Sequence, residues 1–288
     1  MVLGVVGLGL MGGSLALALR PGARFTKIIG CDNRPEHVSE ALKLGLVDEA
    51  VTLKQLIDQS DVIVLAVPVE AIVSLMPQLA HMKKTAVALD LGSTKTPIVE
   101  AIPAAIRSRF VAAHPMAGTE YSGPKAAFPK LYEERIVVLC DTEANDPDAL
   151  QTARSLFEAM GMRMVLMGAK EHDRHAAFIS HMPHAISYAL ANSVLSQEDK
   201  QSILTLAAGG FRDMSRLAKS SATMWIDIFK QNRKALLDSL TVFTSELEKA
   251  KTLIAQSRWD ELKAWMAQAN TLHEIFKPPK HNRKEGQE

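Results

Sequence analysis

His114 opens the segment HPMAGTE and directly follows a short apolar run at residues 110–113. Such a run is typical of a buried strand, so we expect the imidazole at the carboxyl end of a sheet. An imidazole, with an ordinary pKa of about 6.5, can take a proton from an alcohol at neutral pH. His114 is therefore a candidate general base, although a histidine that caps a strand and bonds to backbone would suit the same position.

A second polar segment, DLGSTK at residues 90–95, also follows an apolar run. Ser93 can donate a hydrogen bond to a substrate or to a catalytic imidazole. Alternatively, Ser93 or Thr94 caps the helix that follows, since hydroxyl side chains are preferred at that position. The two roles are compatible with each other.

Cationic groups gather in a third segment, GGFRDMSR at residues 209–216. Paired glycines followed by arginines let a guanidinium approach a carboxylate, which arginine binds through two parallel hydrogen bonds. The alternative is a helix start that carries a surface arginine.

Four histidines lie between residues 172 and 184, two of them in the segment SHMPH. This density invites a zinc site. However, no cysteine is near and no HExxH motif occurs, so we predict no metal.

The chain begins with the uncharged stretch MVLGVVGLGLMGGSLALAL, which ends at Arg20. A signal peptide needs a basic start, and a membrane span needs about 20 continuous apolar residues. Five glycines interrupt this stretch, and they fit another pattern. Residues 7–12 read G-x-G-x-x-G between an expected strand at residues 2–6 and an expected helix at residues 14–19, as in dinucleotide-binding domains.

In that pattern Gly7 permits a tight turn, Gly9 lets backbone approach a pyrophosphate and Gly12 lets helix pack on strand. The next expected strand, residues 27–31, ends at Asp32, where the pattern places an acid that binds ribose hydroxyls. The expected cofactor contacts are Gly7, Gly9, Leu10, Met11, Gly12, Asp32, Val67 and Pro68. The charge of Asp32 favours NAD over NADP, whereas Arg34 is a group that could accommodate a 2′-phosphate.

Composition excludes several other classes of protein. With 47% apolar and 23% charged residues, the 288-residue chain is typical of a globular protein with one or two domains. A net charge of +1 gives no argument for binding nucleic acid or a membrane surface. Cys31 and Cys140, separated and within apolar runs, favour a reducing compartment, and we expect the cytoplasm.

Short apolar runs alternate with helix-length stretches as far as residue 168. This rhythm predicts an α/β Rossmann-type domain over residues 1–168, with a doubly wound parallel sheet. Residues 169–276 then predict an all-helical domain, with a kink at Pro183, one long helix through residues 225–247 and another at 259–276. The polar tail, residues 277–288, predicts disorder. The long helix is apolar on more than one face, which favours a dimer interface or packing within one chain.

The segments GLGLMGGS, LGSTK, HPMAGTEYSG, SHMPHA and GGFRDMSRLAKSSATMW occur in this order and together resemble the prephenate dehydrogenase family of tyrosine biosynthesis. The resemblance implies a Rossmann domain followed by a helical dimerisation domain, in a homodimer. It also implies the NAD-dependent oxidative decarboxylation of prephenate to 4-hydroxyphenylpyruvate.

The resemblance further implies roles for particular residues. His114 would take the proton of the substrate's C4 hydroxyl, supported by Ser93, and Arg216 would bind a substrate carboxylate. His184 and Glu120 would line the same pocket, and Asp213 would orient Arg216. Because the first strand starts at residue 2 and little follows residue 276, we expect the minimal, monofunctional form, in which any inhibition by tyrosine acts at the active site.

Three alternatives remain open at this stage. An arogenate or broad cyclohexadienyl dehydrogenase carries out the same chemistry on a related substrate. A β-hydroxyacid dehydrogenase shares the domain plan but uses a lysine in the helical domain, for which Lys170 and Lys219 are present. A non-enzymatic sensor would bind NADH without turning over a substrate.

Overall fold

The computed structural model describes residues 1–20, 24–119 and 121–275. The chain forms two compact units, Met1–Leu236 and the residues from Leu237 onward. The described part of the first unit contains one sheet of eight strands in the order β3-β2-β1-β4-β5-β6-β7-β8. The strands are β1 Val2–Val6, β2 Lys27–Cys31, β3 Glu49–Ala50, β4 Val62–Leu65, β5 Val87–Asp90, β6 Phe110–Pro115, β7 Ile136–Cys140 and β8 Arg163–Met167.

The strand order reverses between β1 and β4, which lie side by side and parallel. In doubly wound sheets the carboxyl ends of the two strands at such a reversal form the ligand crevice. Here the loop after β1 carries the glycine motif, and the loop after β4 carries Val67 and Pro68. The predicted Rossmann-type sheet is therefore confirmed.

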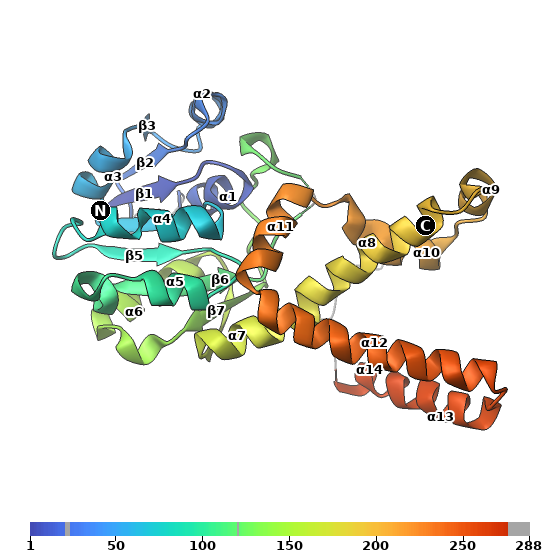
Figure 1. Ribbon diagram of the computed structural model, residues 1–288. Helices are drawn as coiled ribbons and strands as arrows, with labels where there is room; N and C mark the ends of the chain where they lie inside the picture. The colour runs from blue at the N-terminus through green and yellow to red at the C-terminus, as the bar shows by residue number, and fades with distance from the viewer. Residues whose placement is uncertain (21–23, 120, 276–288) are drawn as a thin grey trace, which may run out of the picture. The chain divides into compact units, whose positions relative to one another are not determined.

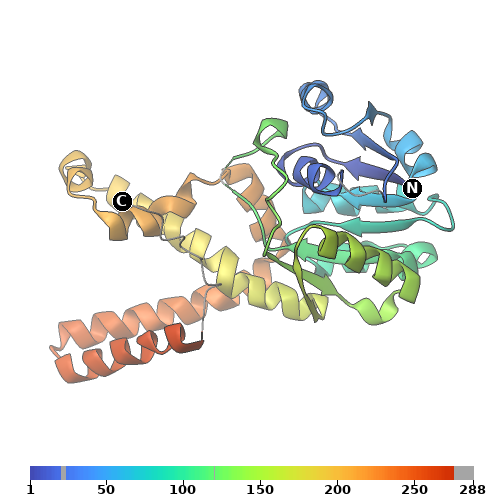
Figure 2. The same ribbon diagram turned by 180° about the vertical axis from the view of Figure 1, so that it is seen from behind.

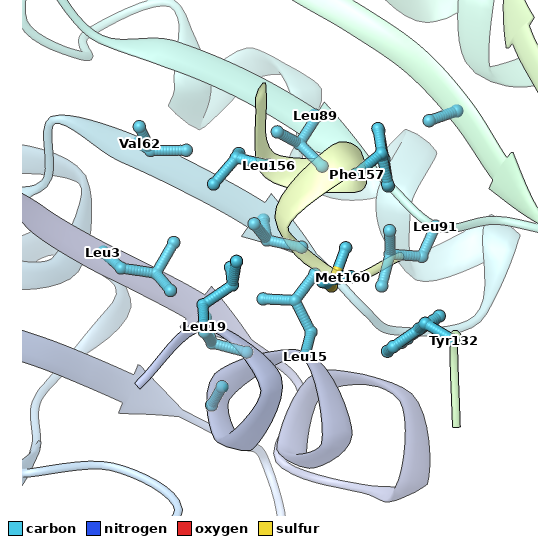
Figure 3. Close-up of a cluster of buried hydrophobic side chains, with 14 of the residues drawn as sticks. Leu3, Leu15, Leu19, Val62, Leu89, Leu91, Tyr132, Leu156, Phe157 and Met160 are labelled. Atoms are coloured by element: carbon cyan, nitrogen blue, oxygen red, sulfur yellow. The ribbon is translucent and has the colours of Figure 1, made fainter. Parts of the chain in front are cut away.

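Helices cover both faces of the sheet, with α4 and α5 in front in Figure 1 and α6 in front in Figure 2. On one face α1 Leu10–Leu19 and α6 Pro147–Ala159 pack on the strands through the cluster drawn in Figure 3, which includes Leu3, Val62 and Phe157. On the other face lie α3 Leu53–Gln59, α4 Val69–Leu79, α5 Thr96–Ala101 and the 3₁₀ turn η1 Ala104–Arg109. Burial on both faces explains why the strands read as continuous apolar runs.

One edge of the sheet differs from the wholly parallel arrangement that the sequence predicted. β7 runs antiparallel to β6, and β8 runs parallel to β7. Among the described residues between β6 and β7 the single helical element is the 3₁₀ turn η2 Pro124–Ala126, whereas a parallel return is usually made through an α-helix. This connection packs on α1 instead, where the Tyr132 hydroxyl donates to the Met11 carbonyl at 2.7 Å.

The predicted change to helices after Gly168 is also confirmed. The remaining elements are α2 Pro35–Lys43, η3 Thr142–Ala144, α7 Ala169–Ala176, η4 Ala177–His181, α8 Met182–Leu195, α9 Lys200–Thr205, α10 Gly209–Ser215, η5 Arg216–Lys219, α11 Ala222–Gln231, α12 Arg233–Ala255, α13 Trp259–Asn270 and α14 Leu272–Ile275. η4 is a π-helical turn that ends two residues before Pro183, in line with the irregularity predicted there. The single long helix predicted through residues 225–247 is wrong, because Asn232 leaves the helical conformation (φ −114°, ψ 32°) between α11 and α12.

In the second unit the Trp265 indole N–H, on α13, donates to Glu246 on α12 at 2.7 Å. Several large apolar side chains of α12 and α13 are about half exposed, among them Leu237, Val242 and Trp259. Phe276 and the tail 277–288, for which the sequence predicted disorder, lie outside the described residues. Within the described ranges no helix has the length and apolar character that crossing a membrane requires.

Candidate active site

The half-buried imidazole of His114 stands on β6, just past the last backbone pair between β5 and β6. Its Nδ1 atom lies 2.8 Å from Nε2 of His172, which is buried on α7. The two rings meet edge to face, with centroids 5.0 Å apart. The strand therefore carries one imidazole and the first helix after the sheet supplies its partner.

The pair continues to a carboxylate, because Nδ1 of His172 lies 2.9 Å from Oδ1 of Asp173. A carboxylate only accepts hydrogen bonds, so His172 carries its proton on Nδ1 and accepts at Nε2 from the Nδ1–H of His114. This assignment, made from the hydrogen-bond network, leaves Nε2 of His114 with a free lone pair. That nitrogen is the atom that can take a proton from a substrate.

The charge states agree with this assignment. Burial lowers the pKa of His114 well below its ordinary value, and the neighbouring His172 and Lys95 lower it further. Burial alone would raise the pKa of Asp173, but hydrogen bonds from His172, Thr96 and Lys95 hold it below the usual value. At neutral pH the site therefore holds a neutral imidazole oriented through a second imidazole by an ionised carboxylate.

A second group of rings follows at η4. His184 stacks on Trp225 with ring centroids 3.5 Å apart, and His181 meets the same indole edge-on at 6.0 Å. The amide of Asn232 donates to the Asp173 carbonyl at 2.6 Å and lies 3.1 Å from Nδ1 of His181. The helix break at Asn232 thus places its amide between the His114–His172–Asp173 group and the His181–Trp225–His184 group, and the amide contacts both.

Arg216 is the first residue of η5, and α8 fixes that turn. The Ser187 hydroxyl accepts from the Ala218 N–H at 3.0 Å, and the Tyr188 hydroxyl donates to the Ser220 carbonyl at 2.8 Å. Burial lowers the pKa of His184, its bond to the Ser180 carbonyl raises it, and the charge of Arg216 lowers it again. The net shift is downward, and the Arg216 guanidinium contributes to it.

The glycine loop fits a dinucleotide. A Cβ on Gly12 would lie 2.0 Å from the Gly7 carbonyl oxygen, so close packing inside the protein requires that glycine. A Cβ on Gly9 would meet no described atom within 4 Å, so the protein itself leaves open space at that backbone. The α1 N-terminus beside it offers N–H groups and a positive dipole to an anion. Asp32, the expected ribose ligand, accepts from the Leu8 and Arg34 N–H groups at 2.8 and 2.9 Å.

The structure gives less support to three other predicted site residues, namely Ser93, Glu120 and Asp213. Ser93 lies half-buried after β5, but the His114 imidazole bonds to His172 instead. Glu120 lies outside the described residues, and within the described part of the chain no ion pair joins Asp213 to Arg216.

The expectation that Ser93 or Thr94 caps the following helix is wrong. No local side chain caps α5, and its first N–H groups, those of Lys95 and Thr96, donate to the Asp173 carboxylate at 2.7 and 2.8 Å. Sequence reasoning also missed His172 and Asp173 as partners of His114.

Comparison with known proteins accounts for both parts of the chain. Residues 15–166 match the family model of the prephenate dehydrogenase nucleotide-binding domain, and residues 168–268 match that of its dimerization domain. A prephenate dehydrogenase of Bacillus subtilis is 34% identical over 264 residues, which are 90% of this chain and 71% of that protein.

Two solved structures are also similar to this chain. The prephenate dehydrogenase of Aquifex aeolicus, in complex with hydroxyphenyl propionate and NAD⁺, is 31% identical, with a TM-score of 0.89 over 96% of this chain and 98% of that chain. The arogenate dehydrogenase of Synechocystis is 34% identical, with a TM-score of 0.81 over 96% of this chain and 100% of that chain. With both family models matched in sequence order, the chain belongs to the prephenate dehydrogenase family.

Proposed function

We propose that this chain catalyses the NAD-dependent oxidative decarboxylation of prephenate to 4-hydroxyphenylpyruvate, within the biosynthesis of tyrosine. The observation that carries the proposal is the orientation of His114. Its Nδ1 is held by His172, and its free Nε2 stands at the sheet edge where a nicotinamide domain places its reacting substrate. Family membership supports the substrate class.

In the proposed reaction His114 accepts the proton of the C4 hydroxyl at Nε2. The imidazolium that forms is stabilised through His172 by the ionised Asp173. When bound, NAD⁺ accepts the hydride from C4. The ring carboxylate leaves as CO₂, its bonding electron pair makes the ring aromatic, and the phenol oxygen takes back a proton.

The other residues bind and orient. Arg216 binds a carboxylate of the dianionic substrate, and Asp213 orients the guanidinium. The proposed pocket also includes His184 and Glu120. Ser93 donates a hydrogen bond to the substrate, because His172 occupies Nδ1 of His114. A continuous chain of contacts supports this grouping. From His114 it passes through His172 and Asp173 to Asn232. From Asn232 it passes through His181 and Trp225 to His184, whose pKa the charge of Arg216 lowers. The residues proposed to hold NAD are Gly7, Gly9, Leu10, Met11, Gly12, Asp32, Val67 and Pro68.

The domain division proposed is residues 1–168 for the nucleotide and 169–276 for substrate and dimerisation. The match to a dimerization domain supports a homodimer, and the half-exposed apolar side chains of α12 and α13 would be covered in it. We also propose a cytoplasmic enzyme and competitive inhibition by tyrosine at the substrate site.

A second candidate activity is the oxidation of arogenate, since an arogenate dehydrogenase is 34% identical to this chain. The test measures NADH or NADPH formation with prephenate and with arogenate, each with NAD⁺ and with NADP⁺. We expect the highest kcat/KM for prephenate with NAD⁺. His114→Asn, assayed beside it, should turn over about 10²–10⁴-fold more slowly. Faster turnover of arogenate would reverse the assignment, and binding of NADH without turnover of either substrate would favour a sensor.

A further inference from the structure

A fully buried ion pair lies directly behind the proposed general base. The Lys95 ammonium contacts Oδ2 of Asp90, the last residue of β5, and both side chains are 0% exposed. Removing two charges from water is unfavourable unless other groups compensate them, and two apolar side chains of similar volume are often as stable. Stability alone therefore does not account for this pair, and the groups that it contacts indicate its role.

The pair holds both polar groups of the residue before His114. Oδ1 of Asp90 accepts from the Ala113 N–H at 3.2 Å, and Nζ of Lys95 donates to the Ala113 carbonyl at 2.6 Å. Backbone pairing between β5 and β6 ends at Leu89 and Val111. At Ala113 the two side chains thus replace the missing strand partner, and the carbonyl they hold belongs to the peptide that enters His114.

Lys95 also reaches the opposite end of the histidine chain. Its backbone N–H donates to Oδ1 of Asp173 at 2.7 Å, the oxygen that lies beside His172. A closed ring of contacts results. It runs from the Lys95 ammonium to the Ala113 carbonyl and His114, then through His172 and Asp173 back to the Lys95 main chain.

We propose that Lys95, paired with Asp90, is a positioning residue for the reaction: it fixes the peptide that carries His114 and the carboxylate that sets the tautomer of both imidazoles. The proposal rests on the proposed function for its kinetic consequence. Its structural consequence, one fixed tautomer of His114, is open to measurement without substrate or cofactor.

The test compares Lys95→Met with the double variant Asp90→Leu, Lys95→Met, in which no buried charge is left unpaired. Lys83→Met is the matched control, because Lys83 also pairs with an aspartate, Asp61, and donates to a backbone carbonyl. The partners of Lys83 precede β4, so this pair lies at the amino end of the sheet, away from His114. Each full-length variant is assayed for kcat and KM with prephenate and NAD⁺. Thermal unfolding and side-chain ¹⁵N NMR of the histidines are recorded on the free protein, with His114→Asn assigning the signal.

We expect both Lys95 variants to lose about 10²-fold in kcat, the effect of a displacement of about 1 Å, with KM close to that of the unchanged chain. The ¹⁵N signals of His114 should move from one fixed tautomer toward an average of two. Lys95→Met should unfold at lower temperature and the double variant should regain much of that loss, while Lys83→Met keeps both kcat and the His114 signals.

A double variant that regains stability together with normal kcat and a fixed His114 tautomer would leave the pair a purely structural role and overturn the proposal. The double variant can decide between the two roles even if Lys95→Met does not fold. Should the unchanged chain turn over no prephenate, the proposed function fails, while the NMR comparison still decides whether Lys95 fixes the imidazole.

Discussion

The 2.8 Å contact between Nδ1 of His114 and Nε2 of His172 determines which nitrogen of His114 can act as a base. Without it the neutral imidazole would distribute its proton between two tautomers. With it the proton stays on Nδ1, because His172 is itself held in one tautomer by Asp173. An arrangement spread over β6 and α7 thus prepares one lone pair for the substrate.

Replacing His172 should therefore impair the reaction without removing the base. We expect His172→Leu to lower kcat by about 10²-fold, toward the lower end of the loss expected for removing the base, with little change in KM. His175→Leu, on the same helix but exposed, is the control. Steady-state kinetics with prephenate measure both, and a normal kcat for His172→Leu would exclude the two-imidazole arrangement from catalysis.

The pH dependence of kcat/KM should reflect the environment of His114. A base must be neutral to act, so activity falls as the pH drops through its pKa. Because burial, His172 and Lys95 hold that pKa well below 6.5, activity should persist below pH 6.5 and decline only in more acidic solution. Initial rates in overlapping buffers locate the acidic limb. A limb at or above pH 6.5 would show that the imidazole is not desolvated as described.

Arg216 should matter for holding the substrate more than for the chemical step. Arg216→Ala removes the proposed carboxylate contact, so KM for prephenate should rise at least about tenfold, the loss of one charge-assisted hydrogen bond, with a smaller change in kcat. Lys230→Ala removes an exposed cation of α11 and serves as control. An unchanged KM would direct the search to another cationic group.

Asp32 should set the preference for NAD. Asp32→Asn keeps an oxygen that can accept from the Leu8 N–H but removes the charge that repels a 2′-phosphate, so the ratio of kcat/KM for NAD to that for NADP should fall. Asp48→Asn is the matched control, since Asp48 also accepts a backbone N–H, that of Ile28, near β2. If the two variants give the same ratio, Asp32 is not the ribose ligand.

Much of the fold was predictable from local pattern. The bounds of β1 and β2 match the predicted strands, since buried parallel strands leave continuous apolar runs next to the glycine motif. The two residues of β3 leave no such run. An apolar run also does not show in which direction its strand runs. The only sequence signal for the reversal of β7 is the connection before it, residues 116–135, which has no helical periodicity.

Local sequence pattern likewise predicts some residues of the site and not others. His114 and Arg216 stand in motifs whose spacing can be read, whereas the contact of His114 with His172 joins residues 58 positions apart. His172 and Asp173 lie in AKEHDRHA, which reads as the first turns of a surface helix. The cap of α5 likewise comes from Asp173, 78 positions after Lys95, where local pattern offers Ser93 and Thr94. Groups brought in from distant segments leave no local signal, because their partners are set by tertiary packing.

His181 should make the protein less stable in acid. Burial lowers its pKa to about 4, so the folded chain keeps this imidazole neutral where the unfolded chain, with a pKa of 6.5, binds a proton. The contribution of His181 to the free energy of unfolding is complete above pH 6.5 and is lost as the pH falls from 6.5 to about 4. That loss amounts to about 3 kcal/mol, and the lowered pKa of His114 acts in the same direction. Urea unfolding at a series of pH values should show this loss. His181→Asn should flatten it relative to His81→Asn, an exposed control, since an asparagine binds no proton in either state. Equal slopes for the two variants would mean that His181 is protonated alike in the folded and unfolded chains.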